Sequence, residues 1–82
     1  MNYTKEITLT LNHVWAVKEF VLISNQQDFT IDVCSVDRHY CIDAKSLMGL
    51  FSLDLSVPII VATKASGAEV DAYFDLISKF SC

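Results

Sequence analysis

The stretch AKSLMGLFSL, residues 44–53, carries the strongest structural signal in this chain of 82 residues. Ser46 stands directly before the apolar run Leu47-Met48-Gly49-Leu50-Phe51. A serine in that position is a typical helix N-cap, because its hydroxyl oxygen accepts a hydrogen bond from a backbone N–H of the first turn. The stretch therefore predicts a short helix that begins directly after Ser46.

The residues before this stretch alternate between strand and helix patterns. The sequence ITLTL at 7–11 alternates apolar and polar residues, which predicts a half-buried strand. Residues 16 to about 26 are apolar in most directions and lack glycine and proline, so their length favours a helix. A second strand is expected at about 31–36, and the β pattern resumes at 40–42. The polar residues 37–39 between them indicate a hairpin.

After the stretch, the sequence predicts one more strand and one more helix. PIIVAT at 58–63 is rich in β-branched residues, and its proline suits the first position of a strand. SGAE at 66–69 has the Ser-x-x-Glu form of a capping box, which predicts a helix start. Apolar residues then recur at helical spacing, at Val70, Phe74, Ile77 and Phe80. The order β-α-β-β-α-β-α favours an α+β fold with helices on one face of a small sheet.

Length and composition limit what the protein can be. The chain is long enough for one domain, which we expect to span residues 1–82. Hydrophobic residues make up 52% of it and the mean hydropathy is +0.39, which is too apolar for a disordered chain. The net charge is −4, so we expect no nucleic-acid partner. No apolar run is long enough to span a bilayer and no signal peptide is evident, so we expect a cytoplasmic protein without a membrane partner.

The cysteines and histidines show no metal-ligand or redox spacing. An odd number of cysteines (Cys34, Cys41 and Cys82) without a secretion signal favours free thiols. A Cys34–Cys41 disulfide would need a hairpin register that brings the Cα atoms within about 7 Å. His13 and His39 are far apart in sequence, and no cofactor motif or nucleophile–base pair is visible. We therefore expect no metal, no cofactor and no enzyme.

The Ser46 stretch resembles the HPr family, the histidine-containing phosphocarriers of the bacterial sugar phosphotransferase system. Its sequence is similar to the pattern Lys-Ser-[Ile/Leu]-Met-Gly-x-Met-Ser-Leu of Gram-positive members, with Phe51 in place of the second methionine. The resemblance runs without gaps from about Glu6 to Phe80. It implies an open-faced sandwich, in which three helices cover one face of a four-stranded antiparallel sheet. The family's hairpin register also implies that Cys34 and Cys41 both point to the uncovered face as diagonal neighbours.

The resemblance also locates the family's phosphoacceptor motif, Gly-[Ile/Leu]-His-x-Arg-Pro, on residues 13–18, HVWAVK. Trp15 replaces the histidine and Val17 replaces the arginine. The indole nitrogen of Trp15 is only a hydrogen-bond donor, so it cannot accept a phosphoryl group. We therefore predict a protein without catalytic residues. The alternative is a phosphocarrier that uses His13, displaced by two positions.

Two further features of the resemblance indicate a regulatory or adaptor protein. Ser46 corresponds to the serine that a dedicated kinase phosphorylates in Gram-positive relatives, and the catabolite-repression HPr-like paralogue acts through this serine alone. The outward positions of the first two helices form the family's docking surface for a transcriptional regulator, a kinase or phosphotransferase-system components. Apolar side chains in those positions favour protein recognition. Here the expected partner-binding residues are Trp15, Val17, Phe20, Leu47, Met48 and Phe51.

Overall fold

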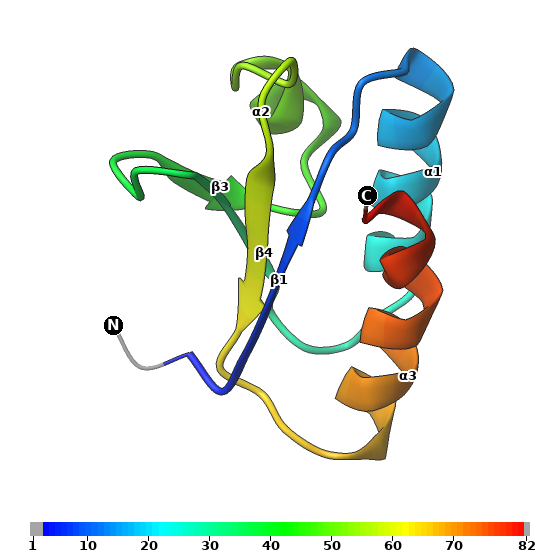
Figure 1. Ribbon diagram of the computed structural model, residues 1–82. Coiled ribbons are helices and arrows are strands. Elements are labelled where there is room, and N and C mark those ends of the chain that lie inside the picture. The colour runs from blue at the N-terminus through cyan, green and yellow to red at the C-terminus, as the bar shows by residue number, and fades with distance from the viewer. Residues whose placement is uncertain (1–2, 82) are drawn as a thin grey trace.

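The computed structural model describes residues 3–81 and confirms the α+β fold (Figure 1). The four strands form one antiparallel sheet in the order β1-β4-β2-β3, and the helices cover one of its faces. The elements are β1 Lys5–Leu9, α1 Val14–Asn25, β2 Asp32–Ser35, β3 Cys41–Asp43, α2 Leu47–Phe51, β4 Ile59–Thr63, α3 Ala68–Ile77 and the 3₁₀ turn η1 Ser78–Phe80.

Alternate residues of each strand point toward the helices. Val61 of β4 lies opposite Ile7 of β1 on one side and Val33 of β2 on the other, and Val33 lies opposite Ile42 of β3. Val33 and Val61 are completely buried. The antiparallel register therefore collects one residue from each strand into an apolar row on the helix-bearing face, as the period of two requires.

Aromatic side chains from α1, α3 and η1 fill the space above this row. Phe20 packs edge-to-face against Phe80, with ring centroids 6.4 Å apart. Tyr73 is fully buried, and its hydroxyl lies 2.7 Å from Oγ of Ser24, which donates a hydrogen bond to the carbonyl of Phe20. This hydrogen-bonded pair ties α3 to α1 within the core and leaves neither hydroxyl without a partner.

The ends of the helices differ in part from the sequence-based expectation. Helix α1 begins at Val14, two residues before the expected start, with His13 as its N-cap. The capping box expected at residues 66–69 is wrong. Gly67, with a φ of 120°, is the N-cap of α3, and no side chain caps this helix. Because Gly67 takes the cap position itself, Ser66 stands one residue too early. The expected burial of Val70, Phe74, Ile77 and Phe80 is confirmed.

The β2–β3 hairpin bends over the uncovered face of the sheet. Its turn contains Arg38 in the left-handed region, with a φ of 62°, where a glycine is more usual. The guanidinium of Arg38 pairs with both carboxylate oxygens of Glu6 on β1, at 2.7 and 3.1 Å. Since β1 and β3 form opposite edges of the sheet, this bidentate pair draws the hairpin tip across the strands between them.

The expectation of free thiols at the two hairpin cysteines is wrong. Cys34 and Cys41 lie directly opposite each other, not diagonally, and form a disulfide with Cα atoms 4.0 Å apart. The sequence left this open because only the register of the hairpin decides which residues face each other. Cys34 is buried, whereas Cys41 is exposed. The third cysteine, Cys82, lies outside the described residues.

Reducing this disulfide is expected to lower the free energy of unfolding by about 2 kcal/mol, because the bond restricts the unfolded chain over a sequence separation of 7 residues. The measurement is the urea midpoint with and without dithiothreitol. In the control variant Cys41→Ser, which cannot form the bond, the reductant should have no effect. Equal midpoints for the oxidised and reduced wild type would contradict this prediction.

Candidate partner-binding surface

Large apolar side chains are exposed on the outward faces of α1 and α2. Trp15 has 62% of its surface exposed and Met48 has 82%. Trp15 and Leu22 are seven residues apart, so they lie on the same side of α1 two turns from each other. We define the α1–α2 surface as the five exposed residues Val14, Trp15, Leu22, Met48 and Phe51.

Contacts at both ends place α2 beside α1. At one end, Nδ2 of Asn25 donates to the carbonyl of Lys45, and Nζ of Lys45 donates to the carbonyl of Gln27 at 2.8 Å. At the other end, Phe51 lines a hollow of about 370 Å³ together with His13 and Val14. The end of α2 therefore lies at the start of α1, so the apolar residues of both helices belong to one surface.

The structure corrects the expected membership of the surface. Val17 and Phe20 are 1% and 0% exposed, so the prediction that they lie on the docking surface is wrong. They share the buried stripe of α1 with Ile23, because each of these residues is three positions from the next and so faces nearly the same way. Leu47 is only partly buried and packs against the core. Sequence reasoning missed Val14 and Leu22, although the helical period relates Leu22 to Trp15.

The first turn of α1 contains the positions where the resemblance predicts the phosphoacceptor and its arginine. The ring of His13 stacks on Trp15 with centroids 5.9 Å apart, and the His13 carbonyl accepts the N–H groups of Ala16 and Val17. Trp15 offers only an N–H donor, and Val17 is in the core.

Ser46 caps α2 as the sequence predicts. Its Oγ accepts a hydrogen bond from the backbone N–H of Gly49 at 3.1 Å, and the residue is partly exposed. Gly49 fits here because a Cβ atom would lie 3.1 Å from this Oγ and 3.2 Å from Cδ1 of Ile42. A side chain at position 49 would therefore crowd the Ser46 hydroxyl, so the cap favours a glycine at this position.

Comparison with known proteins identifies the class. The chain is similar to the crystal structure of HPr-C-His from Thermoanaerobacter tengcongensis, with 30% sequence identity and a TM-score of 0.65 over 94% of this chain and 96% of that one. No family model matches the sequence, and no curated protein matches it. The structural likeness at this identity and coverage shows that the chain belongs to the HPr-like family.

HPr is a phosphocarrier and not a conventional enzyme, and HPr homologues interact with phosphotransferase-system proteins.

Within residues 3–81, no helix has the length and apolar character needed to cross a membrane. The same described residues contain no group of three His, Cys, Asp or Glu side chains that could hold a metal ion.

Proposed function

We propose that this protein is a non-catalytic HPr-like adaptor, a single domain of residues 1–82 that binds partner proteins through the α1–α2 surface. The observation that carries the proposal is the exposure of the Trp15 indole on α1 and of Met48 and Phe51 on α2. The resemblance places Trp15 at the family's phosphoacceptor position. An indole cannot carry a phosphoryl group, but a large exposed aromatic ring is well suited to protein recognition.

The composition of the α1–α2 surface supports recognition of proteins. It combines Trp, Phe and Met, which are enriched at protein interfaces, with two aliphatic residues. Exposing these five side chains to water costs free energy that a partner would recover by burying them. The partner classes expected from the family are a transcriptional regulator, a kinase or components of the phosphotransferase system. A divergent member that lacks the phosphoacceptor, similar to the catabolite-repression paralogue, would keep this recognition and lose carriage.

Trp15→Ala and Met48→Ala are each expected to weaken partner binding about fivefold to thirtyfold, because an exposed aromatic or methionine anchor at an interface contributes about 1–2 kcal/mol. The measurement is titration calorimetry against the regulator, the HPr kinase and the first phosphotransferase-system enzyme of the same organism. Leu76→Ala is a matched control, since Leu76 is an exposed apolar residue of α3 outside the surface. Equal affinities for wild type and all three variants would exclude this surface from binding.

We further propose that phosphorylation of Ser46 switches this recognition. Ser46 is partly exposed and stands two residues before Met48, so a phosphoryl group would add about two negative charges at the edge of the α1–α2 surface. Incubation with ATP and an HPr kinase should add the mass of one phosphoryl group to the wild type and none to Ser46→Ala. Ser52→Ala, at the other end of α2, is the control that should still be modified. An unmodified wild type would leave Ser46 as a helix cap only.

One observation favours a second candidate function, phosphate carriage by His13. Because α1 begins at Val14, the exposed His13 lies at the N-cap, closer to the positive end of the helix dipole than the sequence suggested. Incubation with phosphoenolpyruvate and the first phosphotransferase-system enzyme tests it. An acid-labile phosphate that is lost in His13→Gln but kept in His39→Gln would establish carriage and overturn the non-catalytic proposal. An unlabelled wild type would remove this candidate.

A further inference from the structure

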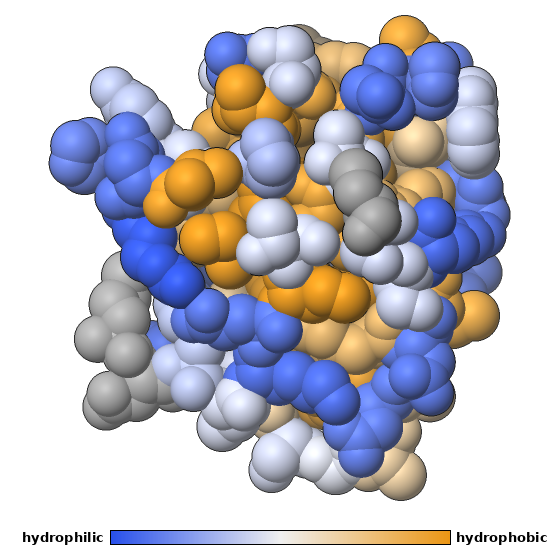
Figure 2. Space-filling view, in the orientation of Figure 1, coloured by the Kyte–Doolittle hydropathy of each residue, from blue (hydrophilic) through white to orange (hydrophobic). Residues whose placement is uncertain are grey.

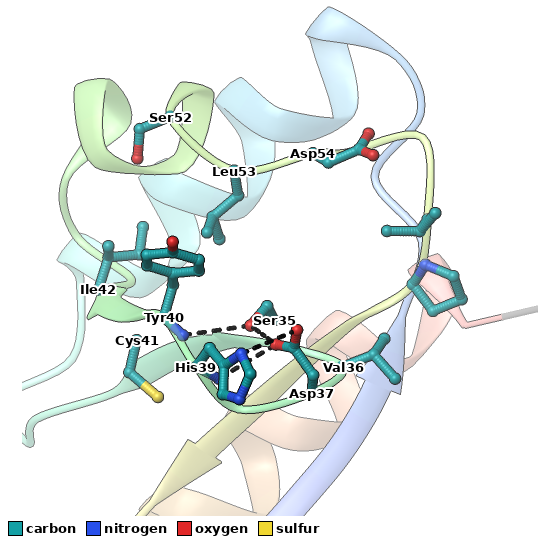
Figure 3. Close-up of a pocket in the computed structure, with 12 residues that line it drawn as sticks. Ser35, Val36, Asp37, His39, Tyr40, Cys41, Ile42, Ser52, Leu53 and Asp54 are labelled. Atoms are coloured by element: carbon teal, nitrogen blue, oxygen red, sulfur yellow. Dashed lines mark hydrogen bonds and ion pairs between the residues drawn. The ribbon is translucent and has the colours of Figure 1, made fainter.

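A second concave region lies outside the α1–α2 surface. It is a groove of about 860 Å³ between the β2–β3 hairpin and the loop of residues 52–58 that connects α2 to β4 (Figure 3). Figure 3 shows Tyr40 and Ile42 projecting from the hairpin toward Leu53 of the loop. None of the five residues of the α1–α2 surface lines this groove, so a ligand could occupy it without covering that surface.

The groove has an apolar interior. Its apolar lining comes from both walls and consists of Val36, Tyr40, Ile42, Leu53, Val57 and Pro58. Tyr40 is 69% exposed, so most of its ring is available for contact. Figure 2 shows the corresponding side of the molecule as an apolar area between the hydrophilic hairpin tip and α2. An open apolar groove of this size accepts side chains of a ligand and gains free energy by excluding water.

The charged groups at the groove are two carboxylates, one on each wall, and the His39 ring, whose Nδ1 lies 3.4 Å from Oδ2 of Asp37 and which is charged only when protonated. Hydrogen bonds from Ser35 Oγ and from the backbone N–H of His39 lower the pKa of Asp37. Hydrogen bonds from Oγ and the backbone N–H of Ser56 lower the pKa of Asp54. Both are therefore ionised at neutral pH. No lysine or arginine lines the groove. The groove thus complements a ligand that is apolar and positively charged.

Backbone groups next to the groove favour an extended peptide as that ligand. The backbone N–H of Ser35 donates to the carbonyl of Tyr40, and the backbone N–H of Ala44 donates to the carbonyl of Ile31. Because hydrogen-bonded and non-hydrogen-bonded pairs alternate along an antiparallel ladder, Cys41 occupies a non-hydrogen-bonded position opposite Cys34 of β2. Its N–H and C=O consequently point away from β2, at the outer edge of the sheet. Such an edge can pair with an added strand, in which alternate side chains enter a neighbouring groove.

We propose that this groove binds an extended segment of a partner protein in which a lysine or arginine stands next to aliphatic or aromatic residues. The apolar side chains enter between Tyr40 and Leu53, and the basic side chain pairs with Asp37 or Asp54. The segment's backbone pairs with the free edge at Cys41. This site is independent of the proposed function, because it uses a different part of the molecule.

Selection of a phage-displayed library of random octapeptides on the immobilised full chain tests the proposal. The enriched peptides should combine basic and apolar residues. In ¹⁵N NMR titrations with a synthetic copy, the amide signals of Tyr40, Cys41 and Leu53 should shift, while that of Trp15 should not. Raising the salt concentration should weaken binding, as expected for a contact between exposed charges.

Variants identify the groups that bind the selected peptide. Asp37→Asn or Asp54→Asn, whichever removes the carboxylate that pairs with the basic side chain, should raise Kd about threefold, the size of an exposed ion pair. Tyr40→Ala should raise it about tenfold. Asp75→Asn, an exposed carboxylate on α3, is the matched control and should leave Kd unchanged. A selection that yields no binder, binders without basic residues, or NMR shifts confined to the α1–α2 surface would overturn the proposal.

Discussion

Phe20→Ala is expected to lower the free energy of unfolding by about 3–5 kcal/mol, the usual cost of truncating a buried phenylalanine. The ring of Phe20 has no exposed surface and packs against Phe80. Alanine would leave a cavity enclosed by α1, η1 and the sheet, which a core of this density closes only in part. Since a domain of 82 residues has a narrow stability margin, the variant should be largely unfolded at 37 °C.

Trp15→Ala is the matched control for this prediction. It removes a larger aromatic side chain from the same helix, but most of that side chain is exposed, so the free energy of unfolding should change by about 0.5 kcal/mol or less. Urea titration followed by far-ultraviolet circular dichroism measures both variants. If the two substitutions had equal effects on stability, the assignment of Phe20 to the core and Trp15 to the surface would be wrong.

Stability is expected to fall as the pH rises from 10 to 12, because burial raises the pKa of Tyr73 to about 12. An unfolded tyrosine loses its proton near pH 10, whereas the folded chain keeps it until about pH 12. In this range the unfolded state binds fewer protons than the folded state, so added base favours unfolding. The contribution of Tyr73 is fully present below pH 10 and decreases by up to about 3 kcal/mol by pH 12.

Comparison with Tyr73→Phe isolates this contribution. The substitution removes the titrating hydroxyl and its hydrogen bond to Ser24, which costs about 1 kcal/mol at neutral pH. Urea midpoints measured from pH 8 to pH 12 should fall less steeply for the variant than for the wild type, because the other tyrosines and the lysines titrate in both proteins. Parallel profiles would show that the Tyr73 hydroxyl does not limit stability in base.

Local patterns predicted most of the fold because they do not depend on distant contacts. The cap at Ser46 requires only a hydroxyl and the N–H of Gly49 three residues later, and the structure contains this hydrogen bond. The burial of Val70, Phe74 and Ile77 follows from the helical period alone. At Gly67 the pattern misled, because the glycine takes a positive φ and becomes the cap in place of Ser66.

The candidate site was only partly predictable. The sequence placed apolar residues on the first helix, but most of that helix is apolar, so the pattern did not specify the buried stripe. The structure places Val17 and Phe20 against the core and leaves Val14 and Leu22 outside. A helix with a weak amphipathic pattern is oriented by the best packing of its large side chains on the sheet, and that packing involves residues distant in sequence.

The sequence by itself determined the order of the elements and predicted an indole, Trp15, at the family's phosphoacceptor position, because the resemblance and the chemistry of an indole are read without the tertiary structure. Only the tertiary structure decided the rotation of α1, the pairing of Cys34 with Cys41 and the groove beside Tyr40. Each of these depends on contacts between distant segments, namely a helix against a sheet, a strand register and a hairpin beside a loop. Such contacts are set by the packing of the whole domain and not by any short stretch of residues.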